Sequence, residues 1–150
     1  MPAQSGKKQH RGSLDDLIGF QLRVAQTRVF KDFEQSIETL GITPAGFSVL
    51  EVLRQNPGLT QSKLAEAVNL DRSSVVPLLD KLETKHLLYR QTSTKDRRNN
   101  HLYLNEQGIQ LLEVSKERVA EHEARISRTL NRDERNTLIS LLSRLAPTES

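Results

Sequence analysis

The pattern of apolar and polar positions predicts a mainly helical chain. Apolar residues recur at the three- and four-residue spacing of amphipathic helices in six stretches, which short polar, glycine- or proline-containing segments separate. The first stretch runs from Leu14 to Leu40, and a helix of that length extends about 40 Å. Too few residues remain to cover it within one protomer, which favours a helix-mediated dimer. The predicted helices span residues 13–40, 44–56, 60–68, 72–85, 106–130 and 131–146.

Capping residues mark where these helices begin and end. Ser, Thr, Asp and Asn side chains accept hydrogen bonds from free amides at a helix start, and glycine or asparagine adopts the left-handed backbone that ends a helix. The predicted N-caps are Ser13 (with Asp16 completing a capping box), Thr43 before Pro44, Thr60, Asp71, Asn105, and Asn131 with Glu134. The predicted stops are Gly41, Pro57-Gly58, Asn69 and the position before Pro147.

Helices 60–68 and 72–85 are joined by the tight turn "VNLD", which indicates a helix-turn-helix. Val75, Leu78, Leu79 and Leu82 form the buried stripe of the second helix. Its other side carries small or cationic residues, which can approach phosphates and base edges, although cations on a helix surface are also common. These residues are Arg72, Ser73, Ser74, Pro77 and Lys81. Pro77 lies past the first turn and should distort the helix slightly on its exposed side.

Two short strands are predicted after this helix, "LLYRQT" at residues 87–92 and "HLYLN" at residues 101–105. The segment between them is strongly charged and includes Lys95, Asp96, Arg97 and Arg98. A helix-turn-helix followed by a hairpin with a basic tip is a winged helix. Such a tip is placed to meet the DNA backbone or minor groove, where arginine is favoured. The plainer alternative is a solvated hairpin tip.

The distribution of charge supports a polyanion-binding module in the middle of the chain. Residues 41–105 carry nine Lys and Arg against six Asp and Glu, whereas residues 106–150 carry seven against eight. The length of 150 residues corresponds to one domain. No membrane-spanning segment and no secretory signal are expected, which together with the absence of cysteine favours the cytoplasm.

The sequence offers no candidate for catalysis. It contains no nucleophile with a base and an orienting partner and no glycine-rich phosphate loop, so an enzyme is not expected. The four histidines (His10, His86, His101 and His122) are not spaced as metal ligands, and no metal or cofactor is expected. His122, between Glu121 and Glu123, is expected on an exposed helix face.

Residues 64–108, "LAEAVNLDRSSVVPLLDKLETKHLLYRQTSTKDRRNNHLYLNEQG", resemble the MarR family of bacterial transcription regulators. Asp96, Arg97 and Arg98 match the family's wing signature, and Leu104 and Gly108 match the pattern that begins its next helix. The order of helices on both sides also fits, so the resemblance covers nearly the whole chain. His86, where the family usually has glycine, and Asn105, where it usually has threonine, depart from the pattern.

The resemblance implies a homodimer whose N- and C-terminal helices interlock and whose winged helices read a pseudo-palindromic operator in double-stranded DNA. It implies that Arg98 enters the minor groove, that Asp96 orients Arg98, and that Ser73 and Ser74 approach the major groove. Regulators of this family usually repress nearby genes. The absence of cysteine excludes the thiol-oxidation switch of some relatives.

Family members often bind small aromatic or phenolic acids, or their thioesters, between the dimer helices and the winged helix. Phe20, Arg23 and Phe47 could line such a cleft, with Arg23 pairing with a carboxylate. The alternative is that both phenylalanines belong to the core and Arg23 to the surface.

The expected fold is mainly α with a small β-hairpin wing. We expect a disordered tail at residues 1–12, an N-terminal dimerisation helix at 13–40, a winged helix-turn-helix at 41–105 and C-terminal dimerisation helices at 106–150. The expected function is a dimeric, effector-responsive transcription repressor. The alternatives are a sequence-indifferent architectural DNA-binding protein and a helical protein-interaction module.

Overall fold

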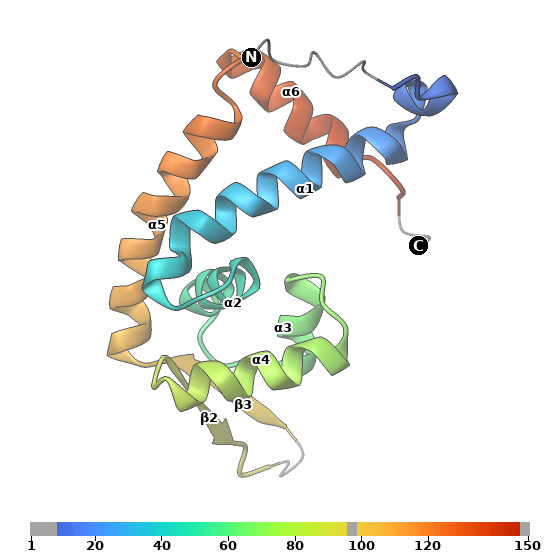
Figure 1. Cartoon of the computed structure of the whole chain (residues 1–150). Coiled ribbons are helices and arrows are strands. Elements are labelled where there is room, and N and C mark those ends of the chain that lie inside the picture. The colour runs from blue at the N-terminus through green and yellow to red at the C-terminus, as the bar shows by residue number, and fades with distance from the viewer. Residues whose placement is uncertain (1–8, 96–98, 148–150) are drawn as a thin grey trace.

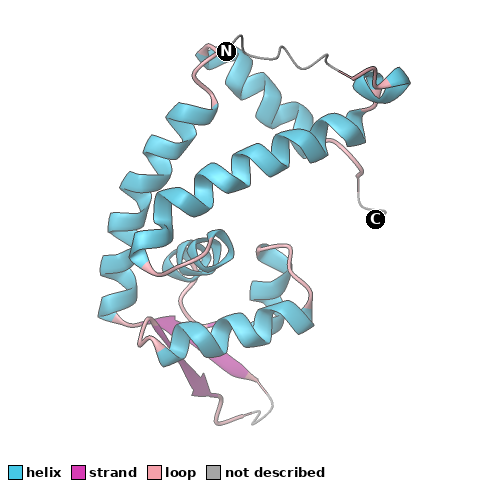
Figure 2. Cartoon of the chain, in the orientation of Figure 1, coloured by secondary structure: helices cyan, strands magenta, loops and turns pink. Residues whose placement is uncertain are grey.

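The computed structural model describes residues 9–95 and 99–147 and consists of helices around a small sheet (Figures 1 and 2). In chain order the elements are η1 (Gly12–Asp16), α1 (Ile18–Ile37), η2 (Glu38–Leu40), α2 (Pro44–Gln55), β1 (Leu59–Thr60), α3 (Gln61–Ala67), α4 (Arg72–Thr84), β2 (Leu88–Thr92), β3 (Asn100–Leu104), α5 (Glu106–Ile126) and α6 (Arg132–Ser143). The predicted fold class, a winged helix flanked by N- and C-terminal helices, is confirmed.

The hydrophobic core lies in the winged helix, where α2, α3, α4 and the sheet meet the adjoining ends of α1 and α5. Ile37 of α1 and Leu112 of α5 are fully buried there, so both long helices are anchored to this core. Away from it, α1 and α5 diverge, and α6 turns back from the far end of α5 towards the beginning of α1 (Figure 1). The molecule therefore has a packed end and an open helical end.

The sheet has three antiparallel strands in the order β1-β3-β2. The two predicted strands form the hairpin, in which Leu88 pairs with Leu104 and Arg90 with Leu102. The third strand, β1, pairs Leu59 with Leu102 and was not predicted. A strand of two residues shows no alternating pattern in the sequence, and β1 is recognised as a strand only because it pairs with β3.

Most predicted caps are confirmed. The side chains of Thr43, Thr60 and Asp71 each accept a hydrogen bond from the amide three residues on, and Asn131 and Glu134 form a reciprocal capping box. Gly41 and Asn69 have the left-handed backbone expected of helix ends. His86 also adopts this conformation, with φ of 59°, in place of the usual glycine.

The predicted start of the first helix at Ser13 is wrong. Residues 12–16 form a 3₁₀ turn, Leu17 is extended, and α1 begins at Ile18. Polar groups here bond locally: His10 Nδ1 accepts from the amide of Gly12, and the Gln21 side chain donates to the Asp15 carbonyl oxygen. Such side chain–backbone bonds compete with a regular helix.

For the second long helix, the predicted end is wrong, and the predicted N-cap is confirmed in its position but not in its hydrogen bond. Leu130 lies beyond the end of α5 at Ile126, in the turn before α6. Asn105 occupies the N-cap position, but its side chain makes no capping bond and instead donates to the carbonyl oxygen of His86. The start of α5 is packed so closely on this turn that a Cβ on Gly108 would lie 2.0 Å from the Leu87 carbonyl oxygen. Asn105 therefore ties α5 to the turn between α4 and β2.

Candidate nucleic-acid interface

The second helix of the helix-turn-helix, α4, begins with a strong cap. The Asp71 carboxylate accepts hydrogen bonds of 2.8 Å from the Ser74 amide and from the Ser73 hydroxyl. These bonds from Ser74 and Ser73 lower the pKa of Asp71, so it is anionic at neutral pH. The first turn of α4 is thus held in place by its own side chains.

The face of α4 opposite the core is exposed along its length. Val75, Leu79 and Leu82 are buried, whereas the five residues predicted to contact DNA are all exposed. Those five are Arg72, Ser73, Ser74, Pro77 and Lys81. The helix continues through Pro77, which lies on this exposed side as expected. Their contacts with DNA remain predictions.

The wing extends from the sheet beside α4. The Thr92 hydroxyl bonds to the Asn100 side chain at 3.3 Å across the outer end of the hairpin, and the Lys95 amide bonds to the Ser93 hydroxyl. Lys95 is exposed. Asp96, Arg97 and Arg98 lie outside the described residues, so their roles also remain predictions.

One feature of this interface was missed in the sequence. Arg90 of β2 forms ion pairs with two carboxylates of α4, 2.8 Å from Asp80 and 3.1 Å from Glu83. The sequence contains a sign of this contact. Side chains alternate along a strand, so Arg90 lies on the same side of the sheet as Leu88, where a charged side chain requires partners.

The three residues proposed for an effector cleft do not meet within one chain. Arg23 stacks on the ring of Phe20, with its guanidinium 5.5 Å from the ring centroid. Phe47 of α2 instead contacts Phe33, with the centroids 5.9 Å apart. Phe33 follows Phe20 by thirteen residues, about 20 Å along a helix.

A polar cluster centred on a buried histidine joins α1 to α5 close to this point. His122 is only 1% exposed, so the expectation of an exposed helix face is wrong for this residue. Its Nδ1 lies 2.7 Å from Asp32, and its ring stacks on Phe33. Arg125 bonds to both carboxylate oxygens of Asp32. The sequence does not reveal this cluster because Asp32 is 90 positions from His122 and 93 from Arg125, and only the crossing of the two helices brings them together.

These contacts fix the charge of Asp32. The hydrogen bond from Arg125, followed by that from His122, lowers the pKa of Asp32 to about 2. Within the described residues, no group of histidine and carboxylate side chains could hold a metal ion. Nor is any helix in the described part of the chain long and apolar enough to cross a membrane.

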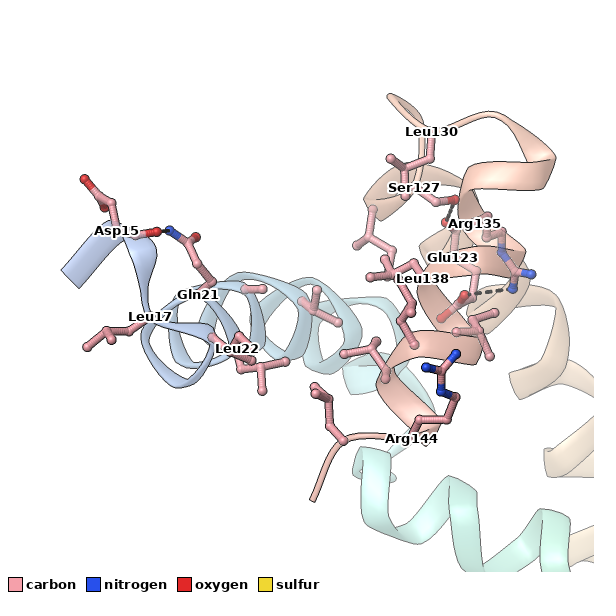
Figure 3. A pocket seen from close by; sticks show the side chains of 18 of the residues that line it. Asp15, Leu17, Gln21, Leu22, Glu123, Ser127, Leu130, Arg135, Leu138 and Arg144 are labelled. Carbon is pink, nitrogen blue, oxygen red and sulfur yellow. Dashed lines mark hydrogen bonds and ion pairs between the residues drawn. The ribbon is translucent and has the colours of Figure 1, made fainter. Parts of the chain in front are cut away.

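The open end of the molecule carries a large apolar groove (Figure 3). Its volume is about 840 Å³, and α1, the end of α5 and α6 line it. Leu17 and Leu22 lie on one side and Leu130 and Leu138 on the other. Apolar side chains of α6 such as Leu138 and Leu142 are 45% and 42% exposed. A patch of this kind is unusual on the surface of a monomer.

Comparison with known proteins gives consistent matches. The family model described as "MarR family" matches residues 42–99. A relative from Thauera aromatica, named as a transcriptional regulatory protein for the hcr operon, is 42% identical over 135 residues, which cover 89% of this chain and 81% of that protein.

Two solved structures of the transcriptional repressor CouR are also similar. One is bound to a 23-mer DNA duplex; it is 39% identical, has a TM-score of 0.88 and covers 93% of this chain and 99% of its own. The other is bound to p-coumaroyl-CoA; it is 37% identical, has a TM-score of 0.85 and covers 95% of this chain and 100% of its own.

Proposed function

The chain belongs to the MarR family of transcription regulators, and from that premise we propose that it is a dimeric repressor released from DNA by an aromatic acid or its CoA thioester. The observation that carries the proposal is the extent of the match to CouR bound to DNA, because it includes both the winged helix and the flanking helices. The proposed role is non-catalytic. It would be performed in the cytoplasm, where a bacterial regulator meets its operator.

The DNA-binding surface would consist of the exposed face of α4 and the wing. Arg72 and Lys81 are proposed to contact phosphates, and Ser73, Ser74 and Pro77 to approach the major groove. Lys95, Asp96, Arg97 and Arg98 are proposed to form the wing tip, with Arg98 in the minor groove. These assignments rest on exposure and on the family pattern.

A second copy of the chain is proposed to cover the apolar groove. Residues 13–40 and 106–150 would then act in dimerisation, and residues 41–105 would form the DNA-binding module. Reading two half-sites requires the recognition helices to be about 34 Å apart, one turn of DNA. The groove would contribute apolar surface to the interface of such a dimer.

The effector is proposed to bind in a cleft formed by both protomers. Arg23 contacts Phe20, whereas Phe47 contacts Phe33 further along α1, and a cleft between the protomers is proposed to bring the three residues together. The thioester ligand of CouR suggests the chemical class. Arg23 would pair with the carboxylate of a free aromatic acid, or with a phosphate of the CoA part of a thioester. An effector that favours a different helix separation would weaken DNA binding by about 1–3 kcal/mol.

The direct test is a titration of the protein against its own upstream DNA and a scrambled duplex at several salt concentrations. We expect a preference of about 10³-fold or more for the upstream DNA, reduced in Arg98→Ala. Addition of p-coumaroyl-CoA, with free CoA as the control, should weaken the specific complex. Equal affinity for both duplexes would instead support an architectural role, and binding to neither would favour a protein partner.

A further inference from the structure

Arg90 occupies an unusual position for a charged residue. It pairs across the hairpin with Leu102, which is fully buried, and it shares a face of the sheet with Leu88, which is 1% exposed. Its side chain is only 18% exposed. Because a partly buried charge without partners is costly, a guanidinium here must be paired.

Both partners belong to α4. One terminal nitrogen of Arg90 donates to Asp80 at 2.8 Å, and the other donates to Glu83 at 3.1 Å. Asp80 and Glu83 are three residues apart, so they lie on one side of the helix. A planar guanidinium can hold both carboxylates at once, which an ammonium group on a flexible chain does less well.

This contact joins the wing hairpin to the recognition helix through two ion pairs. Within the described residues, no other ion pair joins α4 to the sheet. Lys95 follows Arg90 by five residues and lies beyond the end of β2 at Thr92. A small change in tilt at Arg90 therefore becomes a large displacement towards the tip of the wing.

We propose that Arg90 is a positioning residue that clamps the wing to the recognition helix, so that both elements are set to meet DNA together. The proposal rests on the proposed function, since it assumes that α4 and the wing both bind DNA. A clamp of this kind lowers the conformational cost of binding, because the two contact surfaces are held in place beforehand.

The sharpest test removes the carboxylates and keeps Arg90, in the variant D80N/E83Q. If only net charge matters, loss of two negative charges next to the DNA should tighten binding. If the clamp matters, binding to the preferred duplex should weaken by about tenfold, a factor that fits the loss of two ion pairs made by partly exposed carboxylates. The two explanations thus predict opposite signs.

Three further variants complete the design. R90A should weaken DNA binding by a similar factor. R90K should bind DNA more tightly than R90A but less tightly than the unmodified protein. K116A is the matched control, because Lys116 also pairs with two carboxylates, Glu51 and Glu113, but between α2 and α5. Its affinity for DNA should stay within about twofold of the unmodified protein, a change below 0.5 kcal/mol. Circular dichroism melting of each variant establishes that it is folded at the assay temperature.

Amide hydrogen exchange tests the clamp without DNA. In R90A and D80N/E83Q the amides of β2 and β3 should exchange faster, with those of α5 unchanged. DNA binding in D80N/E83Q that equals or exceeds that of the unmodified protein, or unchanged exchange in the hairpin, would overturn the clamp and leave the proposed function standing. Failure of the unmodified protein to select its own DNA, with faster exchange in the variants, would overturn the link to DNA binding and leave the clamp as a structural tie.

Discussion

At the scale of single residues, Asp32 holds the crossing of α1 and α5. It is bonded to Arg125 and to the buried His122, and their hydrogen bonds keep it ionised. Because the pKa of Asp32 in the folded protein lies below its ordinary value of 3.8, the folded state binds this proton less readily than the unfolded state. The contribution of Asp32 to stability is therefore complete above about pH 4 and is lost as the pH falls towards 2.

The variant Asp32→Asn should lose this contribution. We expect its free energy of unfolding to be lower than that of the unmodified protein by about 1–2 kcal/mol near neutral pH, an amount limited because the carboxylate is partly open to solvent. The difference should shrink as the pH falls from about 4 to 2. Urea denaturation across this range measures it, with Glu117→Gln, an exposed position on α5, as the control. A difference that stays constant with pH would contradict this account.

At the scale of elements, α6 is a helix whose apolar face is left largely uncovered by the part of the chain that the structure describes. Leu138, Ile139, Leu141 and Leu142 are all exposed, yet their spacing is that of a buried helix face. An isolated helix of twelve residues is marginal in water, so packing must stabilise it. The groove between α6, α1 and α5 is where a second copy would supply that packing.

Charges on this face should therefore separate the dimer. In the variant L138E/L142E the dimer dissociation constant should rise by at least about tenfold, since two buried interface anchors are lost and two charges are added. As the dimer dissociates, the affinity for an operator with two half-sites should fall. Ser140→Glu, an exposed position on α6 outside the groove lining, should remain dimeric. Light scattering with size-exclusion chromatography reads the oligomeric state, and an unchanged dimer in the double variant would exclude this interface.

At the scale of the whole molecule, the packed end would read DNA and the open end would hold the two copies together. Ile37 and Leu112 anchor both long helices in the core of the winged helix. A change in separation at the open end would therefore be carried to the recognition helices. An effector cleft between the protomers would lie beside these long helices, between the open end and the recognition helices.

Heterodimers can test whether the cleft combines residues of both chains. One chain would carry Arg23→Ala and the other Phe47→Leu, a substitution mild enough to keep the packing against Phe33. A shared cleft leaves one intact site and one doubly altered site in each heterodimer, so calorimetry with p-coumaroyl-CoA should find one tight site. Each homodimeric variant should bind weakly. Two weakened sites in the heterodimer, each matching the affinity of one homodimeric variant, would place the cleft within one chain.

The sequence by itself determined most of the helices and the winged-helix class. Helix limits depend on local chemistry, so Thr43, Asp71 and Asn131 could be identified as caps from their neighbours alone. Strand alternation likewise predicted the hairpin. The exposed face of α4 followed from the spacing of its buried residues.

Only the tertiary structure decided which distant residues meet. Asn105 matched a helix cap in sequence, but the close packing of Gly108 on Leu87 gave its side chain a different partner. His122 lay between two glutamates in sequence, but the crossing of α1 and α5 buried it against Asp32. Arg90 found Asp80 and Glu83 only when β2 packed beside α4. Periodicity fixes which face of a helix or strand is apolar, whereas the partner of a polar side chain depends on how whole elements pack in space.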